Sequence, residues 1–389
     1  MRILIVMEYH PDDVSGGSQI QVLEVARGLA ALGHQVTYLC QRYDRSKPVD
    51  ETDCGVRVLR SLRWHRVFRT LALPQVFLQI WRLRPDVVYQ RYACALTGLA
   101  GLSARALRVP FVWGCSEDAS LEPGFLRRTA PRPSSSLIDR VKGGLLAANA
   151  ALTDVLFRAG VRSAQLVLAQ NTEQARLLRA HLHRDSRLVP NGIRIGALER
   201  RESEQPLVLW LNRVSRGKGA EAFIDLTEAL RPTFPRARFA LVGGRAEDAY
   251  MRAIRERAAQ VPALELTGDV AREETRTWFR RASVFVLTSE GEGFPNVLLE
   301  AWAQGAPVVS LTVDPDGLLT REGLGLVSGS MERLTEDVAR LLTDVDERTQ
   351  LAARARRYVE EHHEIRAVVW RYEELFARLA SSQPEEPAA

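Results

Sequence analysis

Two loops of this 389-residue chain place charged side chains beside glycines at the end of an apolar run. In the first, the apolar run 207–211 leads into Asn212 and Arg213, followed by Gly217 and Lys218. Cations on such a turn can neutralise the negative charge that develops on a departing diphosphate. A basic surface loop without a ligand is the alternative interpretation of this segment taken alone.

The second loop lies within 288–307, between an expected strand and an expected helix. Pro295 occupies a first helical position, so the positive end of a helix dipole would point at a bound diphosphate. Glu292 in the loop and Glu300 on the helix can flank one ligand, because carboxylates accept paired hydrogen bonds from the vicinal diols of a sugar or ribose. An acidic loop and a solvated helical glutamate are the alternative. The donor-binding residues expected here are Gly293, Phe294, Pro295, Asn296, Val297 and Glu300.

Weaker signals lie elsewhere in the chain. Gly16 and Gly17 follow the first strand, and paired glycines allow a phosphate or sugar to approach the backbone closely, although a simple tight turn explains them equally well. They do not form G-x-G-x-x-G, which disfavours a dinucleotide-dependent dehydrogenase.

Asp314–Asp316 and Asp344–Asp346 have D-x-D spacing but lie beside a turn and on a polar helix face, so we expect no metal there. His363, in a charged helical stretch, is expected to be solvated.

The elements that would position these loops alternate between short β-rich runs and amphipathic helices, which predicts parallel sheets wound by crossover helices. The fold class is therefore α/β, with two doubly wound domains whose sheet ends face each other across a cleft. The first domain is expected to span 1–195, a charged linker 196–205, and the second domain 206–365, with a disordered tail at 382–389. The expected strands are 3–7, 36–40, 56–59, 86–89, 110–113 and 165–169, then 207–211, 238–243, 264–267, 284–288 and 307–311.

Charge differs sharply between the two halves of the chain. Residues 1–200 carry 28 Lys and Arg against 17 Asp and Glu, whereas residues 201–389 carry 25 against 31. The first domain is thus expected to contact something anionic, such as a phosphate-bearing acceptor or a membrane surface, and not nucleic acid, for which no reading motif is present. An arginine stripe at Arg60, Arg63, Arg66 and Arg69 precedes Leu71, Leu73, Phe77, Ile80 and Trp81, and this segment either lies on an anionic membrane or is a domain helix with a basic face.

Several classes of protein are disfavoured by what the sequence lacks. The four cysteines have no C-x-x-C spacing, so we expect free, buried thiols and neither a zinc site nor a disulfide framework. No signal-peptide pattern is present, and we expect no apolar run of the ~18 residues that a membrane span needs. The sequence therefore predicts a cytoplasmic protein, with peripheral contact to the inner face of a membrane as an option.

Several of these segments together resemble a known family. The run from Glu292 to Glu300 is similar to the Glu-x7-Glu signature of the retaining glycosyltransferases of family 4, which have the GT-B fold of two Rossmann-like domains. The resemblance also includes Gly16-Gly17, Asn212-Arg213 with Lys218, and further segments, and it extends from residue 1 to about 380. The other matching segments are Pro190-Asn191-Gly192 and Leu241-Val242-Gly243-Gly244.

The resemblance implies a role for each matching residue. Arg213 and Lys218 would hold the donor diphosphate, Glu300 the ribose and Glu292 the transferred sugar, with Gly17 near the phosphates from the opposite domain. It further implies that the helix at 366–381 crosses back to the first domain, that no metal cofactor is needed, and that the anomeric configuration is retained. Many members place a histidine after the strand at 110–113; none is present here, and Glu117 and Asp118 are the candidates for the acceptor side.

We therefore expect a hexosyltransferase that uses a UDP- or GDP-linked sugar and a glycan, lipid-linked or small-molecule hydroxyl acceptor. Arg213, Lys218 and Glu292 are the expected catalytic residues, acting by positioning and charge stabilisation. A nucleotide-sugar epimerase or phosphorylase on the same fold is the alternative among enzymes. A non-catalytic protein that binds a nucleotide or glycan is the alternative from another class.

Overall fold

The chain divides into two compact units. Unit 1 consists of Met1–Gly192 and Ile365–Ala389, and unit 2 consists of Ile193–Glu364. The computed structural model describes residues 1–381 except 15, 64–71, 129–136, 199–204 and 245–247, and it describes no side chains within 137–142. The chain leaves unit 1 just before the expected linker, because Ile193 and Ile195 already pack against the core of unit 2. Most of that linker and the expected tail at 382–389 lie outside the described residues.

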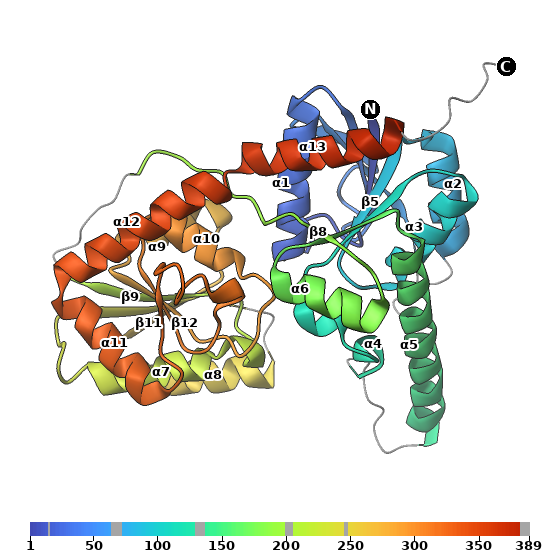
Figure 1. Cartoon of the computed structure of the whole chain (residues 1–389). Coiled ribbons are helices and arrows are strands. Elements are labelled where there is room, and N and C mark those ends of the chain that lie inside the picture. The colour runs from blue at the N-terminus through green and yellow to red at the C-terminus, as the bar shows by residue number, and fades with distance from the viewer. Residues whose placement is uncertain (15, 64–71, 129–136, 199–204, 245–247, 382–389) are drawn as a thin grey trace. The chain divides into compact units, whose positions relative to one another are not determined.

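Unit 1 is built on an eight-stranded sheet with the order β3-β4-β2-β1-β5-β6-β7-β8 (Figure 1). All neighbouring strands pair in parallel except β3 and β4. The strand order reverses between β1 and β5, so the loops that follow these two strands lie side by side at the carboxyl edge. The elements are β1 (Arg2–Val6), α1 (Gly17–Ala31), β2 (Gln35–Gln41), β3 (Asp50–Asp53), β4 (Val56–Leu62), α2 (Leu73–Leu83), β5 (Val87–Arg91), α3 (Ala95–Ala106), β6 (Phe111–Gly114), α4 (Phe125–Arg128), α5 (Leu137–Ser163), β7 (Leu166–Ala169), α6 (Thr172–Leu177), β8 (Arg187–Leu188) and α13 (Ile365–Ser381).

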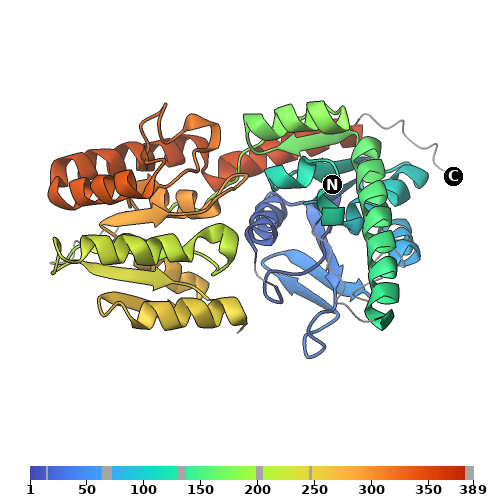
Figure 2. The same cartoon turned by 90° about the horizontal axis from the view of Figure 1, so that it is seen from below.

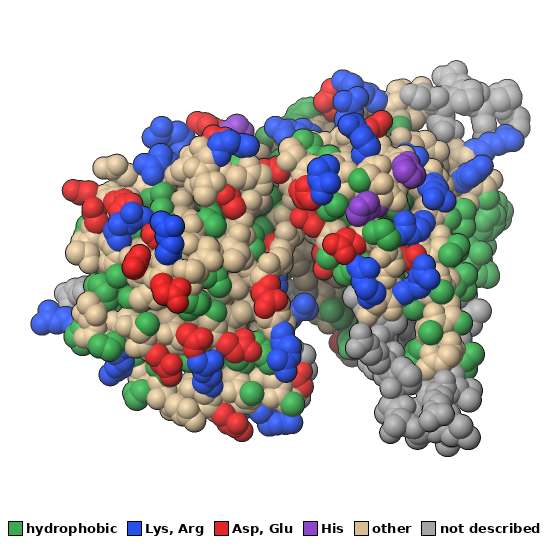
Figure 3. Space-filling model, turned by 60° about the horizontal axis from the view of Figure 1, so that its bottom comes forward, with side chains coloured by type: hydrophobic (Ala, Val, Ile, Leu, Met, Phe, Trp, Pro, Cys, Tyr) green, Lys and Arg blue, Asp and Glu red, His purple; other side chains and the backbone are tan. Residues whose placement is uncertain are grey.

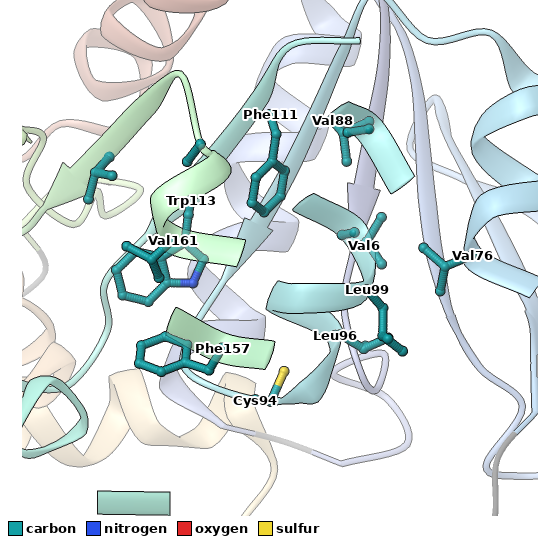
Figure 4. Packing of buried hydrophobic residues seen from close by; sticks show 14 of the residues in the cluster. Val6, Val76, Val88, Cys94, Leu96, Leu99, Phe111, Trp113, Phe157 and Val161 are labelled. Carbon is teal, nitrogen blue, oxygen red and sulfur yellow. The ribbon is translucent and has the colours of Figure 1, made fainter. Parts of the chain in front are cut away.

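Helices α2, α3 and α5 cover one face of this sheet. Most of α3 is buried because α2 and α5 flank it. Helices α3 and α5 approach so closely that a Cβ atom on Gly160 would lie 2.2 Å from the carbonyl oxygen of Thr97. Figure 4 shows the resulting core, with Val6, Val88, Phe111 and Trp113 from strands, Val76 from α2, Leu96 and Leu99 from α3, and Phe157 and Val161 from α5.

Helices α1 and α13 cover the opposite face of the unit 1 sheet. The α13 residues Val368, Val369 and Phe376 are buried there, and the hydroxyl of Tyr372 lies 3.3 Å from that of Tyr89 on β5. The last helix of the chain therefore belongs to the first folding unit. The second face of the sheet is completed only when both ends of the chain are present.

Unit 2 contains a six-stranded sheet with the order β11-β10-β9-β12-β13-β14, and all of its strands are parallel. Its central strands β9, β10 and β12 are short, largely apolar and buried runs, as expected for a sheet with helices on both faces (Figure 2). Helices α9, α10 and α12 cover one face, and α7, α8 and α11 cover the other. The elements are β9 (Leu207–Leu211), α7 (Ala220–Leu230), β10 (Arg238–Val242), α8 (Ala249–Ala259), β11 (Leu264–Gly268), α9 (Arg272–Arg281), β12 (Val284–Leu287), α10 (Asn296–Ala303), β13 (Val308–Ser310), β14 (Leu326–Val327), α11 (Met331–Thr343) and α12 (Val345–His362).

The expected helical stripe of arginines is wrong at its first residue. Arg60 lies in β4, which pairs with β2, and its side chain is buried. Its guanidinium contacts Glu51, and its Nε lies 3.5 Å from a carboxylate oxygen of Asp13. Strand pairing therefore outweighs the helical spacing at this position. Arg66 and Arg69 lie outside the described residues.

Candidate active site

The two loops singled out by the sequence meet at the centre of the unit 2 sheet. Strand β9 lies between β10 and β12, and the chain runs outward from it in both directions, so the strand order reverses between β9 and β12. Ligands of open α/β sheets bind at the carboxyl edge of such a reversal. The loop 212–219 follows β9 and the loop 288–295 follows β12, which places both at this edge.

Lys218 and Glu292 form an ion pair across these loops. They lie 74 positions apart in sequence, and their side chains are 24% and 14% exposed. A backbone hydrogen bond from the Glu290 N–H to the Gly217 carbonyl, 3.1 Å long, also joins the two loops. The ammonium group is thus held at the edge of the sheet by a carboxylate that is itself a candidate ligand for sugar hydroxyls.

Thr288 braces the turn that carries Lys218. Its hydroxyl accepts a 2.8 Å hydrogen bond from the Trp210 indole N–H. The same hydroxyl lies 3.0 Å from the carbonyl oxygen of Lys218 and 2.7 Å from that of Gly219, to which it donates. Because Trp210 is fully buried, this network fixes the turn to the core of unit 2.

Gly219 is required by the geometry of this turn. Its φ of +66° lies in the left-handed region, and an added Cβ atom would lie 2.3 Å from the Thr288 carbonyl oxygen. We expect Gly219→Ala to lower the free energy of unfolding by ~2 kcal/mol or more, measured by denaturant titration. Gly217→Ala is the matched control, since no atom lies within 4 Å of its added Cβ. Equal stabilities of the two variants would contradict the assignment.

Arg213 is exposed, and its guanidinium makes no hydrogen bond or ion pair with any described residue. Its backbone position is fixed from both sides: the Asn212 N–H donates to the Val242 carbonyl and the Val214 N–H to the Gly244 carbonyl, each at 3.1 Å. Arg213 is therefore a cation at the carboxyl edge that has no side-chain partner in the described part of the chain. Arg216, by contrast, lies over the ring of Tyr250, with 4.9 Å from its guanidinium carbon to the ring centroid.

Glu300 lies in the middle of α10 with no hydrogen-bond or ion-pair partner among the described residues. Burial raises the pKa of this carboxyl to about 7, although Arg272 and Arg276 act to lower it. Part of the side chain still reaches solvent. A desolvated carboxylate without a donor is costly unless a ligand supplies hydrogen bonds, so its environment is suited to a hydroxyl-bearing ligand.

The expected donor-binding residues of the loop differ in exposure. Gly293, Phe294 and Pro295 are buried, whereas Asn296 and Val297, in the first turn of α10, are partly exposed. The Phe294 ring packs against the buried imidazole of His363, with 5.4 Å between centroids, and this contact helps to fix the loop.

The expected exposure of His363 is wrong, because its side chain is only 2% exposed. Its ring contacts those of Phe294 and Tyr358, and its carbonyl accepts a 2.8 Å hydrogen bond from the Ile193 N–H. Nothing in the surrounding charged sequence indicated these contacts. The residue belongs to the end of unit 2, directly before the chain returns to unit 1.

Four further site candidates belong to unit 1. Gly16 has extended backbone and precedes α1, and Gly17 is the first residue of that helix. Glu117 is exposed after β6, and the Asp118 carboxylate accepts a 2.9 Å hydrogen bond from the Gln174 side chain. These residues follow β1 and β6 at the carboxyl edge of the unit 1 sheet.

Sequence reasoning missed a set of buried polar side chains that lie where the strand order of the unit 1 sheet reverses. The Tyr92 hydroxyl, after β5, donates a 3.1 Å hydrogen bond to the Glu8 carboxylate, after β1. His10 is buried nearby in the same loop, and burial lowers its pKa. Arg91 is buried at the end of β5 and donates to the Asn191 side chain at 2.6 Å. Polar residues directly after an apolar strand and before Gly16 were the available signal.

The two D-x-D segments have local structural roles. Asp314 accepts hydrogen bonds from the Leu319 N–H at 2.8 Å and the Thr320 hydroxyl at 2.6 Å. Asp344 caps α12 by accepting from the Glu347 N–H at 2.8 Å. Within the described residues, no group of three or more His, Cys, Asp or Glu has metal-binding geometry. Three of the four cysteines are buried as expected, and Cys54 is exposed.

Both units of the chain match families of known proteins. Residues 16–192 match the family described as glycosyl transferase 4-like domain, and residues 205–344 match glycosyl transferases group 1. Sulfoquinovosyl transferase SQD2 of Arabidopsis thaliana is 25% identical, over 93% of this chain and 70% of its own. A putative teichuronic acid biosynthesis glycosyltransferase, TuaC of Bacillus subtilis, is 24% identical, over 80% and 81%. The chain is a glycosyltransferase of the GT-B fold.

Solved structures agree with this fold. Sucrose-phosphate synthase from Thermosynechococcus elongatus superposes with a TM-score of 0.75 at 19% identity, covering 98% of this chain and all of that one. Anabaena HepE in complex with UDP and glucose gives a TM-score of 0.71 at 17% identity, covering 97% of this chain and all of that one. The assignment as a transferase excludes the alternative of a non-catalytic binding protein, which the sequence had left open.

Proposed function

We propose that this glycosyltransferase moves a hexosyl group from a UDP- or GDP-linked sugar to a hydroxyl of a glycan, lipid-linked or small-molecule acceptor, with retention of the anomeric configuration. The proposal places it in family 4 of the retaining enzymes. The observation that carries it is the grouping, at one edge of unit 2, of the Lys218–Glu292 pair and the exposed side chain of Arg213. The bound ligands of HepE are UDP and glucose, which supports a nucleotide sugar as donor.

In the proposed mechanism, Lys218 and Arg213 bind the donor diphosphate and neutralise the charge that develops as it leaves. Glu292 holds the Lys218 ammonium before the donor arrives and then accepts hydrogen bonds from the sugar hydroxyls. Glu300 accepts hydrogen bonds from the ribose. The N-terminal end of α10 adds its dipole to this anion site. We propose that no metal ion is required, so turnover should persist in EDTA.

Thermal-shift measurements with UDP- and GDP-linked hexoses test the donor assignment. A donor at about 100 times its Kd stabilises the native state by ~2.7 kcal/mol, which corresponds to a shift on the order of 5 °C for a unit of this size. Lys218→Ala should abolish the shift. Arg238→Ala should preserve it, because Arg238 begins β10 and therefore lies at the amino edge of the sheet, away from the loops of the site. A panel in which no nucleotide sugar stabilises the wild-type protein would count against the proposal.

Product analysis separates the remaining enzymatic alternatives. Transfer releases free nucleoside diphosphate only when an acceptor is present, an epimerase releases none, and a phosphorylase requires inorganic phosphate. The anomeric configuration of the product, read by NMR coupling constants, tests retention. An inverted product would overturn the retaining assignment while leaving the donor site intact.

A further inference from the structure

The outer surface of the α2–α3–α5 layer in unit 1 exposes apolar side chains in two stripes. On α2, Leu73, Phe77 and Trp81 follow each other at four-residue spacing, and Trp81 is 54% exposed. The opposite side of the same helix buries Val76 and Ile80 in the core. Helix α2 is therefore apolar on both sides, although only one side has a partner within the described part of the chain.

The second stripe lies on α5. Leu145, Leu152 and Val155 are exposed on one side of the helix, Val155 by 62%, and Phe157 faces the core. The stretch 143–163 is long and apolar enough to cross a membrane, yet only 28% of its most apolar window is buried. The sequence reading missed this stretch because Asp154 and Arg158 interrupt it; in the fold they form a 3.2 Å ion pair.

A membrane-spanning role for α5 conflicts with its packing. The backbones of α3 and α5 are in close contact at Gly98 and Gly160, and Phe157 and Val161 fill the core beneath. Withdrawing α5 into a bilayer would expose that core. The exposed stripe is therefore available only for contact along the surface of the unit.

The segment of sequence that contains these helices carries an excess of positive charge. Residues 61–163, which include α2, α3 and α5, carry 15 Lys and Arg against 6 Asp and Glu, whereas residues 1–60 carry 7 against 8. Arg82, Arg84 and Arg162 are exposed at the ends of α2 and α5. Figure 3 shows hydrophobic side chains gathered along the right-hand edge of the molecule with Lys and Arg side chains nearby.

We propose that the exposed apolar stripes of α2 and α5 dock unit 1 on an anionic lipid surface. Leucine, phenylalanine and tryptophan side chains flanked by arginine suit the boundary between headgroups and acyl chains. A second copy of this chain is the less favoured occupant, because the excess of positive charge on both copies would repel. This inference rests on the surface of unit 1 and does not depend on the donor chemistry proposed above.

The chain offers a matched control for the test. Trp81-Arg82 on α2 and Trp370-Arg371 on α13 are the same exposed dipeptide on opposite faces of one sheet, and the tryptophans are 54% and 58% exposed. We expect the double variant W81S/R82E to bind vesicles of phosphatidylcholine and phosphatidylglycerol at least about tenfold more weakly than wild type in co-sedimentation. The double variant W370S/R371E should bind like wild type.

Four outcomes would overturn the proposal. The first is wild-type protein that binds neither neutral nor anionic vesicles. The second is equal binding by the two double variants. The third is binding to neutral vesicles that is as strong as binding to anionic vesicles and is unaffected by high salt. The fourth is a dimer, detected by analytical ultracentrifugation, that W81S/R82E dissociates without any vesicle binding. The thermal shift with a nucleotide sugar should be the same in both variants, so failure here is distinguishable from failure of the donor site.

Discussion

Replacing Lys218 with alanine is expected to lower the rate of sugar transfer by about 10²–10³-fold, because it removes a preorganised cation from the diphosphate that leaves. Lys218 lies at the reversal of the strand order, held by Glu292 and by the turn braced from Thr288. The measurement is steady-state transfer at saturating donor. Lys218→Arg keeps the charge and should recover part of the loss, although its planar head fits the site differently.

The matched control for Lys218 is Arg238, a partly exposed cation that also forms an ion pair at the end of a strand of unit 2. Arg238 begins β10 and lies 2.6 Å from Glu265, and this pair is at the amino edge of the same sheet. We expect Arg238→Ala to leave turnover essentially unchanged, since exposed ion pairs contribute little. Comparable losses in the two variants would show that Lys218 acts through the stability of unit 2 and not through the leaving group.

Donor binding is expected to weaken as the pH falls through 7, with Glu300 as the cause. The pKa of Glu300 is raised to about 7, so this carboxyl is largely protonated at pH 6 and ionised at pH 8. Only the ionised form accepts two hydrogen bonds from the ribose diol. The Kd for the nucleotide sugar should therefore be about tenfold larger at pH 6 than at pH 8 by calorimetry. Glu300→Gln should bind more weakly at pH 8 and lose this dependence.

The free energy of unfolding of the ligand-free protein should depend on pH in the opposite direction from donor binding. Because the pKa of Glu300 is higher in the folded state than in the unfolded chain, the folded state binds the extra proton between about pH 4.5 and 7. The free energy of unfolding therefore falls as the pH rises through this window. We expect Glu300→Gln to stabilise the free protein at pH 8 by up to about 3 kcal/mol, and by progressively less toward pH 4.5.

Glu336 provides the control for both Glu300 measurements. It is an exposed helical glutamate on α11 in the same unit. Glu336→Gln should change neither the donor Kd nor the pH dependence of stability. If Glu300→Gln destabilises the free protein at pH 8, the carboxylate has a structural partner and is not a site kept open for ligand.

The sequence predicted the elements of both units well because their signals are local. Short β-rich runs became strands such as β9, which begins and ends where expected, and β1, which is shifted by one residue. The parallel sheets followed from the alternation of strands with helices. The same reasoning located the loops at 212–219 and 288–295, since both combine glycines with charge directly after an apolar strand.

The errors arose where a distant segment set the environment of a side chain. Arg60 has helical spacing with its neighbours, but pairing of β4 with β2 puts it in a strand and contacts with Glu51 and Asp13 neutralise it. His363 lies in a charged stretch, but the rings of Phe294 and Tyr358 bury it. Phe294 lies 69 positions before His363 and Asp13 lies 47 positions before Arg60, so the local sequence pattern does not indicate either contact.

The sequence by itself determined which residue types were available at the carboxyl ends of the strands. Only the tertiary structure decided that Lys218 meets Glu292, because this contact requires β9 and β12 to be neighbours although β10 and β11 intervene along the chain. Only the tertiary structure decided that Glu300 is desolvated, because burial depends on what packs around α10. Periodicity is a property of a few consecutive residues, whereas the charge state and the partners of a side chain depend on the whole of its surroundings.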